Sequence, residues 1–294
     1  MNAFSRNLLK DVLPPVLVRL IRRRLIRPPW GYFGNYTTWN DAKGDSDGYD
    51  MQFILERVKQ SLALVRDGKA VYERDGFLFD HMEYSFPLLS GLLRVASSNG
   101  NRLNVLDFGG SLGSTYFQCR EFVNGLEELH WNVVEQPSFV ECGQRHFQTD
   151  QLRFYSNLDL CLSEQAINLI LISGTLPYLQ APYEFLTEVI AHQVTNIIID
   201  RTLIFESGRT DRLTVQCVPS HIYGRQVSYP AWIFSRSRLC DQFRDYRLVA
   251  EFNAISRPID LGDLMAYDRG FIFTRDEQVA ICDRPLDGKR HDEL

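Results

Sequence analysis

Several patterns that would assign a function quickly are missing from this chain of 294 residues. Its six cysteines are scattered, with no C-x-x-C pair and no histidine at metal-ligand spacing. This argues against a zinc site and against a disulfide framework. No apolar run approaches the length of about 18 residues that a membrane-spanning helix needs. The sequence therefore predicts reduced thiols, no metal site and no transmembrane segment.

The chain also lacks a broad stripe of basic residues. Its net charge is −5, and residues 1–29 hold seven basic residues and one acid, so the remaining chain carries −11. Surfaces that bind nucleic acid are basic, so the acidic main body argues against DNA or RNA as a substrate. With 45% hydrophobic and 23% charged residues, the composition is that of a soluble globular protein with a sizeable core.

Targeting signals are scarce as well. Pro14, Pro15 and Arg19 interrupt the apolar stretch near the N-terminus, and no small-residue cleavage site of a signal peptide follows. The chain ends in His291-Asp-Glu-Leu294, which matches an endoplasmic-reticulum retention address. Such an address acts only on a protein that first enters that compartment. We therefore interpret the ending as a coincidence and expect a cytoplasmic protein.

The most informative stretch that is present runs from Asn104 to Tyr116. An apolar run ends at Asp107, continues through a turn rich in glycine and serine, and opens into a helix-like segment at Ser114. Many folds hold nucleotide-like ligands with a strand, a glycine turn and a helix N-terminus. The glycines let the backbone approach the ligand, and the helix end offers free N–H donors. A tight glycine turn without a ligand is the alternative.

The spacing of this stretch resembles the first motif of class I S-adenosylmethionine-dependent methyltransferases. The pattern is Asp107-x-Gly109-x-Ser111-x-Gly113, with Ser111 in place of the family's commoner central glycine. A dinucleotide fingerprint, G-x-G-x-x-G, does not fit from Gly109 onward, which disfavours a nicotinamide dehydrogenase. The resemblance implies S-adenosylmethionine as the cofactor, bound by Asp107, Gly109, Gly110, Ser111 and Gly113.

A second acidic strand end follows. Residues 129–135 are typical of a strand that ends in Glu135, and Gln136-Pro137 leaves it as a turn. An acid at the end of the second strand commonly binds the ribose hydroxyls of an adenosine ligand in such sheets. Glu135 resembles the ribose-binding acid of the methyltransferases, and we add Glu135 and Gln136 to the expected cofactor site.

From about Arg102 onward, strand-like and helix-like segments alternate, which predicts a mostly parallel sheet with helices on both faces. We expect strands at 104–108, 131–135, 152–156, 168–172 and 196–202, and helices near 114–124, 137–147, 159–165, 181–192 and 235–245. The closing runs 247–252 and 270–274 resemble the terminal antiparallel hairpin of the methyltransferase sheet. The predicted fold class is α/β, with a Rossmann-like class I methyltransferase sheet.

An N-terminal helical extension is expected ahead of this sheet, with helices from Met51 to Val65 and from Tyr84 to Ala96. Residues 16–27 form a basic amphipathic segment, too short to span a membrane but long enough to lie at its surface. Packing of its apolar side on protein is the alternative. We divide the chain into the extension 1–98, the methyltransferase domain 99–276 and a polar tail 277–294.

Ligands of open parallel sheets bind beyond the carboxyl ends of the strands. At the exit of the fourth strand, Ser173 and Gly174 occupy the place of the methyltransferase segment that lies beside the transferred methyl group. Gly174 permits close approach of the backbone, and Tyr178 would add a rigid aromatic wall. We therefore expect Ser173 and Gly174 to contact the cofactor and Tyr178 to contribute to catalysis.

After the fifth strand, residues 215–232 concentrate His, Tyr and Trp where a plain connector would carry polar turn residues. Long loops in compact domains are commonly functional, and methyltransferases often build the acceptor pocket here. His221 is the first candidate for a general base and Tyr223 for a supporting hydroxyl. His81, next to Glu83 and Tyr84, is the competing base.

Across about 28–275 the chain resembles a family of class I methyltransferases encoded with bacterial surface-polysaccharide enzymes. The resemblance rests on 29–32, 105–113, 134–136, and 214–216 through 229–230. From it we expect an enzyme that methylates an oxygen of a surface glycan or its precursor, with a small-molecule or glycan acceptor. The basic segment 16–27 adds an expected peripheral contact with the inner membrane face. A non-catalytic, methyltransferase-like scaffold in a glycan-assembly complex is the alternative.

Overall fold

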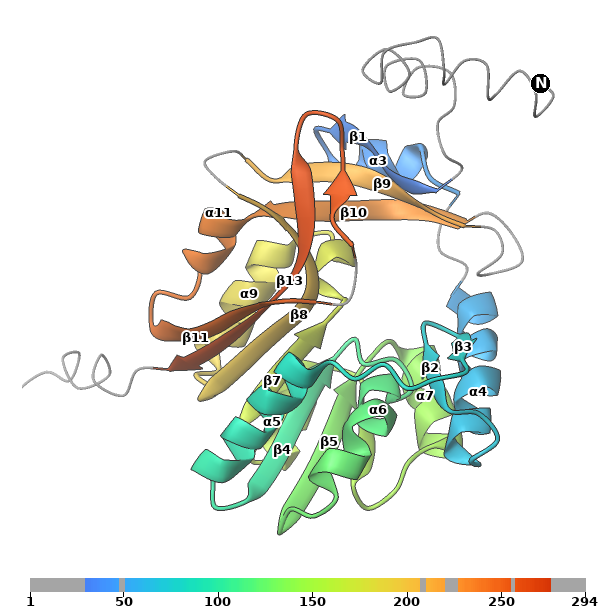
Figure 1. The fold of residues 1–294 in the computed structure, drawn as a ribbon, viewed down its shortest axis with the longest axis vertical. Helices are drawn as coiled ribbons and strands as arrows, with labels where there is room; N and C mark the ends of the chain where they lie inside the picture. Colours follow the sequence, from blue (N-terminus) through green and yellow to red (C-terminus); the bar gives the residue numbers. More distant parts are fainter. Residues whose placement is uncertain (1–29, 48–50, 207–209, 220–226, 255–256, 276–294) are drawn as a thin grey trace, which may run out of the picture.

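The computed structural model describes residues 30–47, 51–206, 210–219, 227–254 and 257–275 (Figure 1). Its central sheet has the strand order β6-β5-β4-β7-β8, continued by β13 and β11. The parallel strands are β4 (Arg102–Phe108), β5 (Glu128–Val134), β6 (Leu152–Tyr155), β7 (Leu169–Ser173) and β8 (Asn196–Phe205). Only β13 (Met265–Arg275) runs antiparallel, both to β8 and to β11 (Tyr246–Asn253). The predicted α/β sheet with its closing antiparallel hairpin is confirmed.

The helices between these strands begin and end close to the predicted residues. They are α6 (Ser114–Val123), α7 (Pro137–His146), α8 (Leu158–Glu164) and α9 (Pro182–Ala191). Proline occupies the first turn of α7 and α9, where its missing N–H costs nothing. The Asn157 side chain caps α8 by accepting from the Leu160 N–H at 2.8 Å. The helix expected at 235–245 is shorter than predicted: α11 covers only Arg236–Cys240.

The parallel strands are buried on both faces, as their continuous apolar runs predict. Successive residues point to opposite sides, so Val105 joins one core cluster with Leu62, Leu92 and Trp131. Leu106 joins the other, with residues such as Ile170, Ile199 and Phe273. Helices α4 (Met51–Arg66) and α5 (Phe86–Ser98) of the predicted extension contribute to the first cluster.

A second, antiparallel sheet lies beyond the carboxyl ends of the parallel strands, at the top of Figure 1. It consists of β1 (Gly31–Tyr36), β9 (Arg212–Val218) and β10 (Val227–Ser235), and α3 (Trp39–Gly44) packs on it. The end of β10 pairs with the end of β8, which makes the two sheets continuous. The region expected to be a long acceptor loop is therefore largely two strands, and the N-terminal part of the chain supplies the third.

Two short elements were not predicted. A hairpin of β2 (Tyr72–Arg74) and β3 (Phe77–Phe79) follows α4, and β12 (Ile259–Asp260) pairs with the start of β13. Strands of two or three residues are too short to show a periodic pattern. Of the helices described, none is long and apolar enough to cross a bilayer.

Candidate functional site

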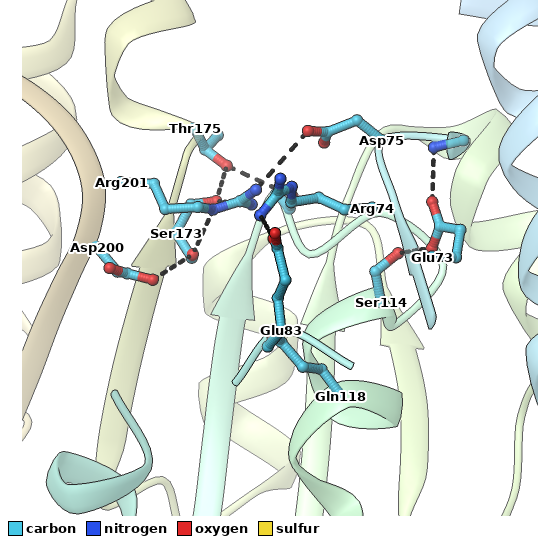
Figure 2. A network of polar contacts seen from close by, with 12 residues as sticks. Glu73, Arg74, Asp75, Glu83, Ser114, Gln118, Ser173, Thr175, Asp200 and Arg201 are labelled. Atoms are coloured by element: carbon cyan, nitrogen blue, oxygen red, sulfur yellow. Dashed lines mark hydrogen bonds and ion pairs between the residues drawn. The ribbon is translucent and has the colours of Figure 1, made fainter. Parts of the chain in front are cut away.

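A narrow cavity of about 50 Å³ lies where β4 and β7 end, beside the middle of β8. The ends of β4 and β7 contribute Gly109 to Ser111 and Ser173 to its lining, and β8 contributes the pair Asp200–Arg201. Helix α6 contributes Ser114, Thr115 and Gln118, and the β2–β3 hairpin covers the cavity with Tyr72, Arg74 and Asp75. Figure 2 shows that these polar side chains converge from separate parts of the chain. The cavity therefore lies at the sheet edge that the sequence selected.

The glycine turn after β4 has a left-handed backbone at three positions. Gly109 has a φ of +70°, Ser111 of 57° and Gly113 of +95°. A Cβ at Gly109 would clash with the Thr175 side chain, and one at Gly110 would clash with the Asp107 carboxylate. Gly113 precedes α6 without a capping side chain, so the first N–H groups of that helix remain available to a ligand.

Asp107 lies beneath this turn and does not reach the cavity surface. It is 1% exposed, and its Oδ2 accepts a hydrogen bond from Trp131 Nε1 at 2.9 Å. Its Oδ1 has no hydrogen-bond partner among the residues described. Burial raises the pKa of Asp107 to about 7, opposed by the bond from Trp131. Asp107 thus supports the turn from below, in a site that disfavours its charge.

Glu135 lies directly after β5 and turns onto the same glycine loop. Its carboxylate accepts hydrogen bonds from the backbone N–H of Gln136, at 2.7 Å, and from that of Ser111. Burial raises the pKa of Glu135, and these two bonds oppose the rise. Gln136 is exposed and precedes α7. The two strand ends proposed to hold one cofactor are therefore in direct contact.

Ser173 connects the end of β7 to the middle of β8. Its hydroxyl donates to Asp200 Oδ2 at 3.1 Å and accepts from Arg201 Nε at 3.1 Å (Figure 2). Gly174 has a φ of +69°, and a Cβ there would come within 2.9 Å of the Arg201 guanidinium. Thus Ser173 lines the cavity and Gly174 follows it, next to a charged pair that the sequence analysis did not name.

The hairpin that covers the cavity is also held by charged residues that were not predicted. Glu73 is 1% exposed, and its carboxylate accepts from Ser114 Oγ at 2.6 Å and from the Gly76 N–H at 2.6 Å. Asp75 lies 3.7 Å from Arg201 across the cavity. Neither residue stands in a motif, because their partners lie far away in the sequence.

A row of polar and aromatic side chains crosses the antiparallel sheet beside the cavity. Tyr32 of β1 pairs with Gln216 of β9, which pairs with Tyr229 of β10. Tyr178 meets this row from below: its hydroxyl donates to Gln216 Oε1 at 2.8 Å and hydrogen-bonds Tyr32, and its ring packs on Tyr229 at 5.2 Å. We call these four residues the tyrosine face. It brings together two of the separate segments on which the family resemblance rests, 29–32 and 214–216 through 229–230.

The two expected catalytic residues His221 and Tyr223 lie outside the described residues. The competing base, His81, is exposed and bound to Asp80 at 2.6 Å. It does not line the cavity. Among the residues described, no group of three His, Cys, Asp or Glu side chains is arranged to hold a metal ion.

Comparison with known proteins gives no sequence relative: no protein-family model matches this chain, and no curated protein matches it. Some solved structures are similar to it at TM-scores below 0.5. The N-terminal domain of EvdMO1, in the presence of SAH and D-fucose, is 15% identical, with 78% of this chain and 98% of that chain covered and a TM-score of 0.44. CalS10, an amino pentose methyltransferase from Micromonospora echinaspora with SAM bound, is 10% identical, with 66% and 92% covered and a TM-score of 0.41.

A third similar structure is the magnesium protoporphyrin IX methyltransferase ChlM from Synechocystis PCC 6803, with SAM bound. It is 12% identical, with 89% of this chain and 96% of that chain covered and a TM-score of 0.39. Similarity at this level supports no statement about the residues of this chain. The site is therefore interpreted from the residues of this chain alone.

Proposed function

We propose that this chain is an S-adenosylmethionine-dependent methyltransferase that acts on a hydroxyl of a glycan or glycan precursor. One observation carries the proposal. The left-handed turn 109–113 brings bare backbone to a polar cavity at the sheet edge, with the Glu135 carboxylate next to it. A turn that excludes side chains at Gly109 and Gly110 and presents a helix N-terminus suits a ligand with a charged polar end.

These residues fit the parts of the proposed cofactor. The N–H groups at the start of α6 suit the carboxylate of its methionine end, and Glu135 suits its ribose hydroxyls. Ser111, Gln136, Ser173 and Gly174 complete the proposed binding set, and the buried Asp107 supports the glycine turn from below. The bound cofactor would supply an activated methyl group on its sulfonium.

The chain's own task is then mainly to position the acceptor. Methyl transfer is an in-line displacement, and correct orientation supplies much of its rate. The tyrosine face suits such a role, because it offers flat rings together with hydroxyl and amide groups at one rim of the cavity. Aromatic rings that stack and polar groups that hydrogen-bond are the complement of a sugar. We place the acceptor there, with Tyr178 nearest to the cofactor side.

A surface glycan or its lipid-linked precursor is the acceptor we propose. A lipid-linked acceptor would give the basic segment 16–27 a purpose at the inner face of the membrane, where basic residues contact anionic lipid. The protein would then be cytoplasmic and peripherally bound. His221 and Tyr223 remain proposed members of the acceptor side.

Two assays test the proposed function. Calorimetry should show binding of S-adenosylhomocysteine and no comparable binding of NAD. Release of S-adenosylhomocysteine should then be measured with water-soluble and lipid-linked glycan fractions as acceptors. Binding without turnover on any fraction would favour the scaffold alternative, and absence of binding would exclude the methyltransferase.

A further inference from the structure

One buried oxygen on the cavity lining has no partner. Asp200 is 2% exposed and lines the cavity, and Ser173 Oγ donates to its Oδ2 at 3.1 Å. Its Oδ1 has no hydrogen-bond partner among the residues described. Of the buried side chains with such an unpaired atom, Asp200 is the one among the described residues that lines this cavity. Since a buried acceptor is costly to leave unpaired, Asp200 Oδ1 is suited to a donor brought by a ligand.

The backbone is distorted to place this carboxylate. In the pairing of β8 with β13, Ile199 is opposite Phe271 and Thr202 is opposite Arg269. Two residues of β8, Asp200 and Arg201, are therefore opposite the single residue Gly270, and this arrangement is a β-bulge in β8. Arg201 has a φ of 52°, a left-handed conformation that glycine would adopt without strain. In a regular strand, neighbouring side chains point to opposite faces, whereas here Asp200 and Arg201 line the same cavity. A strained, non-glycine residue on a cavity lining marks this position as a candidate for function.

The carboxylate is also held in a fixed orientation. The Ser173 hydroxyl accepts from Arg201 Nε at 3.1 Å and therefore turns its own proton toward Asp200 (Figure 2). A second contact from Arg201, to the Ser173 carbonyl oxygen at 3.3 Å, fixes the guanidinium. Burial raises the pKa of Asp200, while Arg201 and Ser173 oppose the rise. A carboxylate with a raised pKa, one oxygen held by Ser173 and one buried oxygen without a partner has the properties of a general base.

We propose that Asp200 is the catalytic residue that takes the proton from the acceptor hydroxyl, with Ser173 and Arg201 as positioning residues. This inference rests on the proposed function. The acceptor oxygen forms a bond to the methyl carbon, and the bond between that carbon and sulfur breaks, leaving its electron pair on sulfur in S-adenosylhomocysteine. The hydroxyl proton moves to Asp200 Oδ1 and from there to water.

A binding experiment without an acceptor tests this placement. A base for the reacting hydroxyl must lie close to the sulfonium charge, which S-adenosylmethionine carries and S-adenosylhomocysteine lacks. At about pH 8, Asp200→Asn should raise the Kd for S-adenosylmethionine by about fivefold or more and leave that for S-adenosylhomocysteine within about twofold. Glu141→Gln is the control: it removes a charge that is 70% exposed and outside the cavity lining, and both Kd values should stay within about twofold.

If Asp200→Asn weakened the binding of S-adenosylmethionine and S-adenosylhomocysteine equally, the inference would be overturned, because the carboxylate would then contact a part that the two ligands share. An unchanged pair of Kd values would overturn it as well. Failure of the wild type to bind either ligand is a different result, since it removes the proposed function itself. If Asp200→Asn does not fold, Ser173→Ala replaces it and should shift the same ratio in the same direction.

Turnover gives the second readout. On a glycan fraction that the wild type methylates, Asp200→Asn should lose about 10²-fold or more in kcat while it still binds S-adenosylhomocysteine. Turnover within about threefold of the wild type would assign the proton transfer to another group, with His221 the first alternative.

Discussion

The Ser114 hydroxyl donates a hydrogen bond of 2.6 Å to the buried carboxylate of Glu73. The bond joins the β2–β3 hairpin of the N-terminal extension to the first turn of α6, on the cavity lining (Figure 2). The hairpin turn is fixed to the same carboxylate through the Gly76 N–H. A single buried acid thus holds the cover of the cavity to the glycine motif.

The charge of Glu73 should make stability depend on pH. Burial raises the pKa of Glu73 to about 7, so the folded protein binds a proton more tightly than the unfolded chain. Such a group stabilises the fold at pH values below its unfolded pKa, and this contribution is lost as pH rises through about 7. The Tm of the wild type should therefore fall between about pH 5 and about pH 8, and the Tm of Glu73→Gln should fall less over the same range. Scanning fluorimetry checks this, with the exposed Glu127→Gln as control. A Tm difference between Glu73→Gln and wild type that stays constant with pH would contradict it.

Ser111 should be replaceable by glycine with a gain in stability. Its φ of 57° is unfavourable for a residue with a Cβ, by about 1–2 kcal/mol. The greater freedom of glycine in the unfolded chain offsets about half of this. Ser111→Gly should thus raise the free energy of unfolding by about 0.5–1 kcal/mol in urea titration.

Gly109→Ala is the matched comparison for Ser111→Gly. It adds a Cβ to the same turn, at a φ of +70° and against the Thr175 side chain, and should destabilise the protein by about 1–3 kcal/mol. Similar effects of the two substitutions would show that this turn is not built as described.

Glu135→Ala should weaken the binding of S-adenosylhomocysteine by about 1–3 kcal/mol, because it leaves ribose hydroxyls unpaired and frees the Ser111 and Gln136 N–H groups. Calorimetry measures the loss. Glu141→Ala, which removes an exposed partner of Arg145, is the control. Equal affinity of wild type and Glu135→Ala would remove Glu135 from the site.

The tyrosine face should affect the acceptor and not the cofactor. Gln216→Leu removes the acceptor of the Tyr178 hydroxyl and should raise the KM for the glycan fraction by about fivefold or more, with S-adenosylhomocysteine affinity unchanged. Tyr84→Phe, on a ring that packs against Phe122, is the control. If Gln216→Leu lost cofactor affinity, the tyrosine face would not be the acceptor site.

Residues 16–27 should bind membranes that carry anionic lipid. Each basic residue near such a surface contributes about 1 kcal/mol, and the attraction weakens in salt. Sedimentation with anionic liposomes at low salt should pellet the full-length protein and leave a form beginning at Trp30 in the supernatant. If both stay in the supernatant, the segment packs on protein instead.

The sequence predicted most where structure is encoded locally. The turn after Asp107 and the acid Glu135 follow from short patterns, because strand, turn and helix signals lie within a few residues of one another. The parallel strands were found for the same reason, since they are apolar runs separated by helical periodicity.

The residues that were missed depend on contacts between distant segments. Glu73 gains its role from Ser114, and Tyr32 from Gln216 and Tyr178. The bulge at Arg201 arises from how β8 meets β13 and β10, and it leaves no local pattern. Asp200 lies in the middle of β8, and only the structure shows its unpaired oxygen beside the cavity.

The pairing of β1 with β9 has a consequence for how the protein is made. Gly31 emerges from the ribosome early, yet its partner Cys217 is synthesised only after the whole parallel sheet. Contacts so distant along the chain form late and slowly, because a long loop must close before they form. The parallel sheet can therefore assemble during translation. Strand β1 has already left the ribosome by then, but it has no partner until β9 is synthesised. We expect newborn chains to hold the cofactor region in order before the tyrosine face exists, and to be most prone to edge-to-edge aggregation in that interval.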